Sequence, residues 1–292
     1  MLPQISRRLY RAFVLVALAA IPSLACPGGR QQSNSDKTAQ EQTSARPDLS
    51  DCQGVGEGDP GRRLVDLCEF ALTFRHQLPD FVCEQTTTTS HSKATMNAEV
   101  TFEKGHEHYS DLTVDGKAVK ENWSMRKAMD FVSTGELGSN LVDLFRLPRA
   151  PEFRFRKEEK FGHTPALLYD FYIAAERNRY WALHDSRGMT VYPEYKGQIW
   201  IDRNSGRPLR LAFRAVNLPT DFDFREAMIS IDYNDVAIAG AGAFLLPSRS
   251  TTKACLQHVR PADTKCRTNT LVFHDCRKFG TESHILSDKP QD

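Results

Sequence analysis

The chain has 292 residues and a formal net charge of +1, from 38 basic and 37 acidic side chains. That length suits one large domain or two small ones, and apolar residues, at 40%, suffice for a hydrophobic core. The balanced charge shows no basic footprint for nucleic acid, so the sequence predicts no nucleic-acid partner.

The first 25 residues have the composition of a secretory signal peptide. Arg7, Arg8 and Arg11 precede the apolar run AFVLVALAAIPSLA, which ends before Cys26. The run is too short to span a membrane comfortably. The sequence therefore predicts an exported, periplasmic protein from which residues 1–25 are removed.

The residue after the apolar run, Cys26, bears on whether cleavage is by ordinary signal peptidase or by the lipoprotein route. Ser23-Leu24-Ala25 fits ordinary signal peptidase, but followed by Cys26 it looks like a lipoprotein signal, which would put a lipid on Cys26. Lipoprotein signals usually carry Leu where this chain has Ser23. Without Cys26, an even set of six cysteines remains, which favours paired cysteines in an exported chain. We expect a membrane anchor at Cys26; a soluble periplasmic or secreted product is the alternative.

Residues 26–59 are predicted to form a disordered polar tether. They are rich in Gly, Ser, Gln and Asp and contain almost no large apolar residue, so they bury too little surface to offset their ordering entropy. Behind a lipidated Cys26, such a tether would hold the domain off the membrane. An ordinary disordered leader is the alternative.

A helix is predicted at the start of the domain, which spans residues 60–286 and is followed by a C-terminal tail at 287–292. Asp59 is a good N-cap, and Pro60 suits the first helical position. Apolar residues recur at helical spacing from Leu64 to Phe74, and the helix should end before Pro79.

The remainder is predicted to be mainly β, because apolar and polar side chains alternate along it. Strands are expected in FVCEQTTTTS (81–90), AEVTFE (98–103), HEHYSDLTVDGK (106–117), EFRFR (152–156), LLYDFYI (167–173), RLAFR (210–214), MISIDY (228–233) and LVFHDCRKF (271–279). Short helices are expected at 123–131 and 138–147. About ten strands joined by short turns predict a single antiparallel sheet, strongly curled, with no second domain.

The stretch GQIWIDRNSGRPLRLAF (197–213) predicts a β-hairpin with one solvent-exposed face. Asp202 begins the turn, and Gly206 supplies the positive φ that a short hairpin loop often needs. On the returning strand Leu209, Leu211 and Phe213 are predicted to share one face, with Arg210 and Arg214 opposite.

This hairpin resembles one in a known superfamily. Trp200-Ile201-Asp202, two variable positions, Ser205-Gly206 and then Pro208-Leu209-Arg210 are similar to the central hairpin of the LolA/LolB-like bacterial lipoprotein carriers. The resemblance implies an exported protein or lipoprotein whose sheet curls into an open half-barrel, with helices closing its concave side around an apolar cavity. That cavity holds acyl chains, or binds lipid or protein signals in related regulators. The resemblance identifies no ligand-contacting residue, and no cofactor is predicted.

A longer pattern, over roughly residues 60–285, resembles uncharacterised exported proteins common in acidobacteria-like genomes. The segments that carry the likeness are LPDFVCEQT (78–86), STGELGSNLVDLF (133–145) and RKFGTESHI (277–285). Those proteins have no assigned activity, so this resemblance implies no reaction.

Six aromatic residues are the candidate ligand-binding residues, because strand alternation can place all of them on the concave face. They are Phe102, Phe153, Phe155, Tyr169, Phe171 and Phe213. In a half-barrel they would line a cavity for a hydrophobic ligand, and in a closed core they would fill space. The leading prediction is a non-catalytic envelope protein that binds a lipid or an acyl chain. An envelope protein-protein interaction module is the first alternative, and a hydrolase is the second.

The hydrolase alternative would need histidines and carboxylates in one cleft. His106 and His108 share a strand face without a recognisable third ligand, so we predict a solvated strand edge and no metal site. Asp221 and Asp223, in TDFDF, are predicted to be loop caps or a surface pair more readily than an acid–base pair. No catalytic residue is predicted.

The cysteines beyond Cys26 are predicted to form disulfides. Cys255 and Cys266 bracket LQHVRPADTK, a loop that a disulfide would tie. Cys276 would then pair elsewhere, with Cys52, Cys68 or Cys83 as candidates. A zinc site is not favoured, because the chain has no close Cys-x-x-Cys pair.

Overall fold

The computed structural model describes residues 49, 52, 58–90, 92–104, 106–119, 136–137, 139–146, 151–257 and 266–279. The predicted signal peptide, Cys26, most of the predicted tether, the predicted helix at 123–131 and the C-terminal tail lie outside these residues. Among the described residues, no helix is both long and apolar enough to cross a membrane.

The described elements are mainly strands. The helices are α1 (Gly58–Gln77), α3 (Ser139–Phe145) and the short 3-10 helix η2 (Ala175–Arg177). The strands are β1 (Phe81–Thr89), β2 (Thr95–Glu103), β3 (His106–Val114), β4 (Lys117–Ala118), β5 (Glu152–Phe161), β6 (Thr164–Ile173), β7 (Leu183–His184), β8 (Thr190–Val191), β9 (Glu194–Asp202), β10 (Pro208–Val216), β11 (Phe224–Ile238), β12 (Gly242–Leu256) and β13 (Cys266–Lys278).

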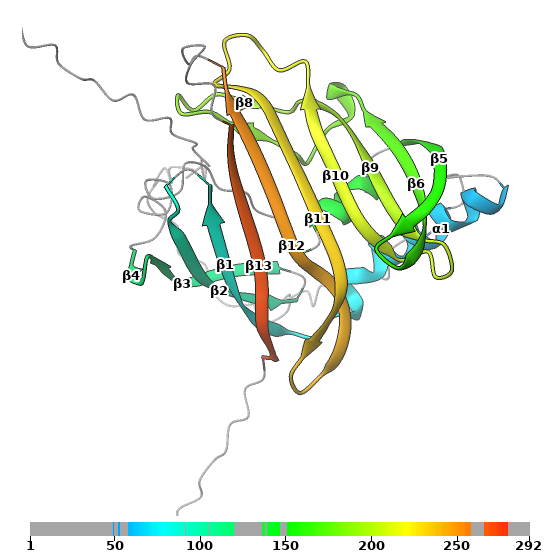
Figure 1. Cartoon of the computed structure of the whole chain (residues 1–292), viewed down its shortest axis with the longest axis horizontal. Coiled ribbons are helices and arrows are strands. Elements are labelled where there is room, and N and C mark those ends of the chain that lie inside the picture. The colour runs from blue at the N-terminus through cyan, green and yellow to red at the C-terminus, as the bar shows by residue number, and fades with distance from the viewer. Residues whose placement is uncertain are drawn as a thin grey trace, which may run out of the picture.

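Eleven of these strands form one antiparallel sheet, as the alternating sequence predicts. The order across the sheet is β4-β3-β2-β1-β13-β12-β11-β10-β9-β6-β5, and β7 pairs with β8 separately. The sheet is open, because β4 and β5 stand at its two ends and do not pair with each other. The last described strand, β13, lies between β1 and β12 and so joins the early and late parts of the sheet (Figure 1).

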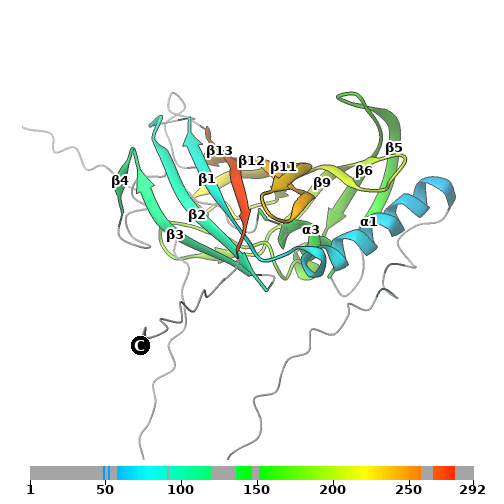
Figure 2. The same ribbon diagram turned by 90° about the horizontal axis from the view of Figure 1, so that it is seen from below.

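The helices α1 and α3 lie on one face of the sheet, beside the half that contains β5, β6 and β9 (Figure 2). We term this the helix-covered face, and the other the open face. Leu64 and Leu67 of α1 pack there against apolar side chains of the sheet such as Ile199, Ile201 and Leu211. All five are almost fully buried, and each contributes about 1.5–3 kcal/mol by leaving water.

A second apolar cluster lies between β1, β2, β13 and the end of α1. Phe81 and Phe102 stack there with ring centroids 5.2 Å apart, and Phe74 of α1 packs in the same cluster. These two clusters lie under different halves of the sheet, and a third, smaller cluster contains Phe222, Phe224 and Ala254.

The hairpin formed by β9 and β10 has the turn that its sequence predicts. The Asp202 carboxylate accepts a hydrogen bond from the backbone N–H of Asn204 at 2.8 Å. Gly206 has φ +72°, and a Cβ added there would lie 2.6 Å from the Cβ of Asp66 in α1. Glycine is therefore needed both for the turn and for the close approach of the helix.

Three disulfides join all six cysteines that the described residues contain. They are Cys52–Cys68, Cys83–Cys276 and Cys255–Cys266. The third agrees with the predicted loop closure, and the second gives Cys276 its partner. Cys52 is fully buried in the core, so the packed part of the chain begins inside the segment predicted to be a tether. Disulfides in this number fit an exported protein.

Candidate functional site

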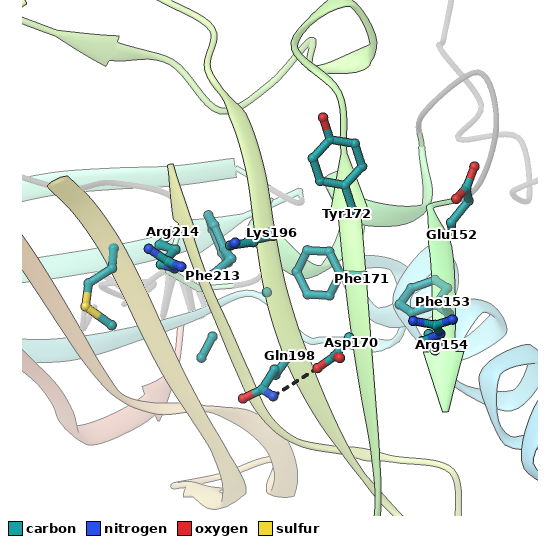
Figure 3. A pocket seen from close by; sticks show the side chains of 13 residues that line it. Glu152, Phe153, Arg154, Asp170, Phe171, Tyr172, Lys196, Gln198, Phe213 and Arg214 are labelled. Atoms are coloured by element: carbon teal, nitrogen blue, oxygen red, sulfur yellow. Dashed lines mark hydrogen bonds between the residues drawn. The ribbon is translucent and has the colours of Figure 1, made fainter. Parts of the chain in front are cut away.

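A hollow of about 890 Å³ lies on the open face and crosses strands β5, β6, β9, β10 and β11 (Figure 3). Two rows of side chains, each row made of register partners, form its surface. One row is Arg154, Asp170, Gln198 and Ala212; the other is Glu152, Tyr172, Lys196, Arg214 and Met228.

The fold places these side chains outward by strand alternation. In β9, Tyr195 and Ile199 are buried on the helix-covered face, so Lys196 and Gln198 between them point to the open face. The hollow is thus built from the polar half of an alternating pattern, interrupted by Met228, which is half-buried on β11.

Gly197 has no side chain, so neighbouring atoms approach its Cα closely beneath the hollow. A Cβ at this position would lie 2.3 Å from the Ala212 carbonyl oxygen, 2.5 Å from Phe171 Cζ and 2.7 Å from Phe213 Cβ. Phe171 and Phe213 therefore pack over the space that Gly197 leaves empty, and they border the hollow from the helix-covered side.

Two carboxylates at or next to the hollow, Asp170 and Glu194, already form ion pairs or hydrogen bonds within the protein. Asp170 pairs with Arg156 at 3.0 Å and accepts a hydrogen bond from Gln198 at 2.9 Å. Glu194, next to the hollow, accepts hydrogen bonds from Asn217 and, at 2.6 Å, from the Tyr172 hydroxyl. The hydrogen bond to Glu194 raises the pKa of Tyr172, which stays a neutral donor at neutral pH.

Three cations of the hollow are not engaged in this way. Lys196 and Arg214 are direct register partners on β9 and β10, and both side chains are exposed. Within the described ranges, neither they nor Arg154 forms an ion pair. The hollow can therefore offer positive charge next to the apolar surfaces of Ala212 and Met228.

The six aromatic candidates do not share one site. Phe153, Phe171 and Phe213 border the hollow, and all three belong to the core cluster of the β5–β11 half or pack against it. Phe171 and Phe213 are only 3% and 5% exposed.

The other three aromatic candidates lie away from the lining of the hollow. Tyr169 is buried in the same core cluster, and its ring meets that of Phe155 edge-on at 5.5 Å. Phe155 is 41% exposed on the edge strand β5, whereas Phe102 is buried in the second cluster, under the other half of the sheet.

The residues of the hydrolase alternative are not brought together. His106 and His108 are exposed on β3. Asp221 and Asp223 precede β11, which is five strand spacings from β3, or roughly 24 Å.

Asp223 has a structural role in a small loop cluster. It accepts hydrogen bonds from Ser186 through both the backbone N–H and the hydroxyl, as expected of a loop cap. Nearby, Asp185 is fully buried and pairs with Arg187 at 2.7 Å. Burial alone would raise the pKa of Asp185, but hydrogen bonds from Arg187 and from the backbone N–H of Met189 outweigh it and lower that pKa.

Two groups of ligand-type side chains lie close together in the described part of the chain. Glu226 lies beside Cys255 and Cys266, whose sulfurs are consumed in a disulfide. Glu84, His274 and Asp275 lie on β1 and β13, where both carboxylates are exposed. His106 and His108 belong to neither group.

Sequence reasoning placed Arg214 on a wet face but did not identify Tyr172, Lys196 or Met228 as part of a site. Each looks like an ordinary outward residue of its own strand. The signal that sets them apart is the pairing of Lys196 with Arg214, which depends on the register of β9 against β10.

No protein-family model matches the chain, and no curated protein matches it. Among solved structures, it is similar to a LolA superfamily protein from Nitrosomonas europaea, with 13% sequence identity and a TM-score of 0.37. The match covers 73% of this chain and 92% of that chain. A DUF1329 family protein from Desulfovibrio piger shares 8% identity over 75% of this chain and 92% of that chain, with a TM-score of 0.37. A chain of the MucA/MucB complex from Pseudomonas aeruginosa shares 12% identity over 74% of this chain and 93% of that chain, with a TM-score of 0.21.

None of these matches supports the resemblance to uncharacterised proteins of acidobacteria-like genomes. The fold class rests on the sheet itself: a mainly β protein with one large, open antiparallel sheet and few helices.

Proposed function

We propose that the protein is a non-catalytic binding protein of the cell envelope, which holds a hydrophobic ligand such as a lipid or an acyl chain. The observation that carries the proposal is the hollow on the open face. Its volume of about 890 Å³ is in the range of ligand sites, and Tyr172, Ala212 and Met228 give it apolar surface.

The envelope location is supported by covalent structure. Three disulfides form in oxidising compartments and are rare in the cytosol. The predicted signal peptide agrees with this, and a lipid on Cys26 would keep the binding domain close to a membrane.

The aromatic candidates have a supporting role in this proposal. Phe171 and Phe213 form the layer beneath the hollow, and Phe153 closes it at the β5 end. Because Phe171 and Phe213 are buried in the core, they hold the backbone of the hollow in place, which lowers the entropy cost of binding. Phe102 belongs to the other core and is not part of the proposed site.

Native mass spectrometry of the full chain from an envelope fraction, together with lipid extraction, tests the proposal. We expect a co-purifying lipid or acyl compound. In the variant Ala212→Trp, an indole would fill the hollow from the middle of its floor, since Ala212 points outward, and the lipid should be lost.

Thr251→Trp is the matched control, because Thr251 lies on the open face of β12 outside the hollow. It should retain the lipid. A wild-type protein that carries no lipid and binds none on addition would refute the proposal.

An envelope interaction module is the second candidate, favoured by the edge strand β5. In the described residues β5 pairs only with β6, and it carries the exposed ring of Phe155. An unpaired edge can accept a strand from another protein. A lipid-free preparation that retains a single protein, cross-linked through a photoreactive residue at position 155, would favour this candidate over the first.

A further inference from the structure

On the open face, cations of one strand are commonly paired with carboxylates of the next. Arg210 on β10 pairs with Asp232, its register partner on β11. Lys253 pairs with Glu226 at 3.0 Å in the neighbouring strand pair. Opposite charges on neighbouring strands are the arrangement that stabilises a sheet.

The hollow breaks this arrangement. Lys196 and Arg214 are register partners, so their Cβ atoms are about 4.5–5.5 Å apart on the same face, where like charges destabilise a sheet. Their next neighbours across the sheet are Tyr172 and Met228, neither of which is anionic. The nearby Glu194 is engaged by the Tyr172 hydroxyl and by Asn217.

A third cation repeats the pattern at the other end of the hollow. Arg154 stands opposite Asp170 in register, but that carboxylate is taken by Arg156 and Gln198. The hollow therefore has cations at both ends, and in the part of the chain that the structure describes none of the three forms an ion pair, although the Glu152 carboxylate lines the same end as Arg154.

We propose that the hollow binds the anionic headgroup of a phosphate-bearing lipid, with Lys196 and Arg214 as its main contacts. This inference rests on the proposed function and names the class of ligand. A phosphate diester placed between the two side chains accepts hydrogen bonds from the planar guanidinium and the ammonium group, and it removes their mutual repulsion. Tyr172, Ala212 and Met228 then contact the apolar part of the same molecule.

The test compares two soluble lipids with the same chains and different headgroups. Dihexanoyl phosphatidylglycerol and dihexanoyl phosphatidylcholine are titrated into the full-length protein by calorimetry, below their micelle concentrations. We expect the anionic lipid to bind about tenfold or more tightly than the zwitterionic one, and the difference to shrink as salt is added.

Single variants identify the contacts. Lys196→Gln and Arg214→Gln should each raise the Kd for phosphatidylglycerol about tenfold and change the Kd for phosphatidylcholine less than about twofold. Arg249→Gln, on the open face of β12 outside the hollow, is the matched control and should leave both values unchanged. Because the two cations repel each other, neither hollow variant should melt below the wild type.

The outcomes separate the inference from the function on which it rests. Equal affinity for both lipids would overturn the headgroup assignment and leave the lipid-binding function standing. Binding of neither lipid would overturn both. Glycerol 3-phosphate binding as tightly as phosphatidylglycerol would assign the site to a free phosphate ester and overturn the lipid part of the inference.

Discussion

Removing the disulfide that joins the two ends of the domain should cost more stability than removing either of the others. Cys83 and Cys276 are 193 positions apart in the sequence, whereas Cys255 and Cys266 are 11 apart. A cross-link stabilises mainly by restricting the unfolded chain, and the effect grows with the logarithm of the loop length. The perturbation is a pair of double variants, in which both cysteines of one disulfide become alanine.

The magnitudes follow from those separations. The loop-closure relation gives about 5 kcal/mol for Cys83–Cys276 and about 3 kcal/mol for Cys255–Cys266. The Cys83→Ala/Cys276→Ala variant loses two buried sulfurs, whereas Cys266 in the other pair is half-buried, so lost packing adds to the difference of about 2 kcal/mol expected from loop length. In a domain of this size that difference corresponds to roughly 4–8 °C in Tm.

The assay is urea unfolding followed by circular dichroism under non-reducing conditions, with free-thiol counts to confirm that the two remaining disulfides are formed. The Cys83→Ala/Cys276→Ala variant should have the lower midpoint of the two. If the Cys255→Ala/Cys266→Ala variant is equally or more destabilised, the entropic reasoning is wrong and local packing at the β12–β13 end decides the cost.

Three further predictions follow from other parts of the fold. Gly197→Ala should lower the free energy of unfolding by about 1–3 kcal/mol, because its Cβ would meet a backbone oxygen at 2.3 Å; unchanged urea unfolding would refute this. The lowered pKa of Asp185 means that its carboxylate stabilises the fold fully above about pH 4 and less as pH falls through the folded-state pKa; thermal melts of Asp185→Asn should therefore show a weaker loss between pH 6 and pH 3 than the wild type. Cys26→Ala should move the protein from the membrane fraction to the soluble fraction and abolish labelling by a radioactive fatty acid, and a variant that remains membrane-bound would refute the anchor.

The local elements of the fold could be predicted from the sequence because their signals are local. Helix α1 follows from the spacing of Leu64, Leu67 and Ala71, and the β9–β10 turn follows from Asp202 and Gly206. In each case a few neighbouring residues determine the backbone, and the structure confirms the element.

The strand order could not be predicted in the same way. Nothing near β13 indicates that it pairs with β1, which lies almost 200 positions earlier in the chain. Alternation fixes which face a side chain takes, but pairing partners depend on packing between distant segments. For this reason the sequence left Cys52, Cys68 and Cys83 as possible partners of Cys276. The pairing of β1 with β13 brings Cys83 next to it.

The hollow could not be predicted from the sequence for a related reason. Lys196 and Arg214 each read as a normal outward residue, and only their register shows that two cations stand opposite each other. The packing of Phe171 against Gly197 likewise depends on the register of β6 against β9. Strand alternation alone did not show which of the six aromatic candidates the helices would bury, nor that Phe102 would lie in a different apolar cluster from Phe171.

The position of β13 between β1 and β12 also has a consequence for the order of folding. A chain that emerges with its N-terminus first can form the β1–β2 and β11–β12 hairpins early, because their partners are adjacent in sequence. The two halves of the sheet can be joined only when the final strand arrives. For a chain exported as its N-terminus predicts, nearly the whole polypeptide must cross the membrane before the fold is complete. The pairing of β13 with β1 and β12 is therefore the step that completes the described sheet.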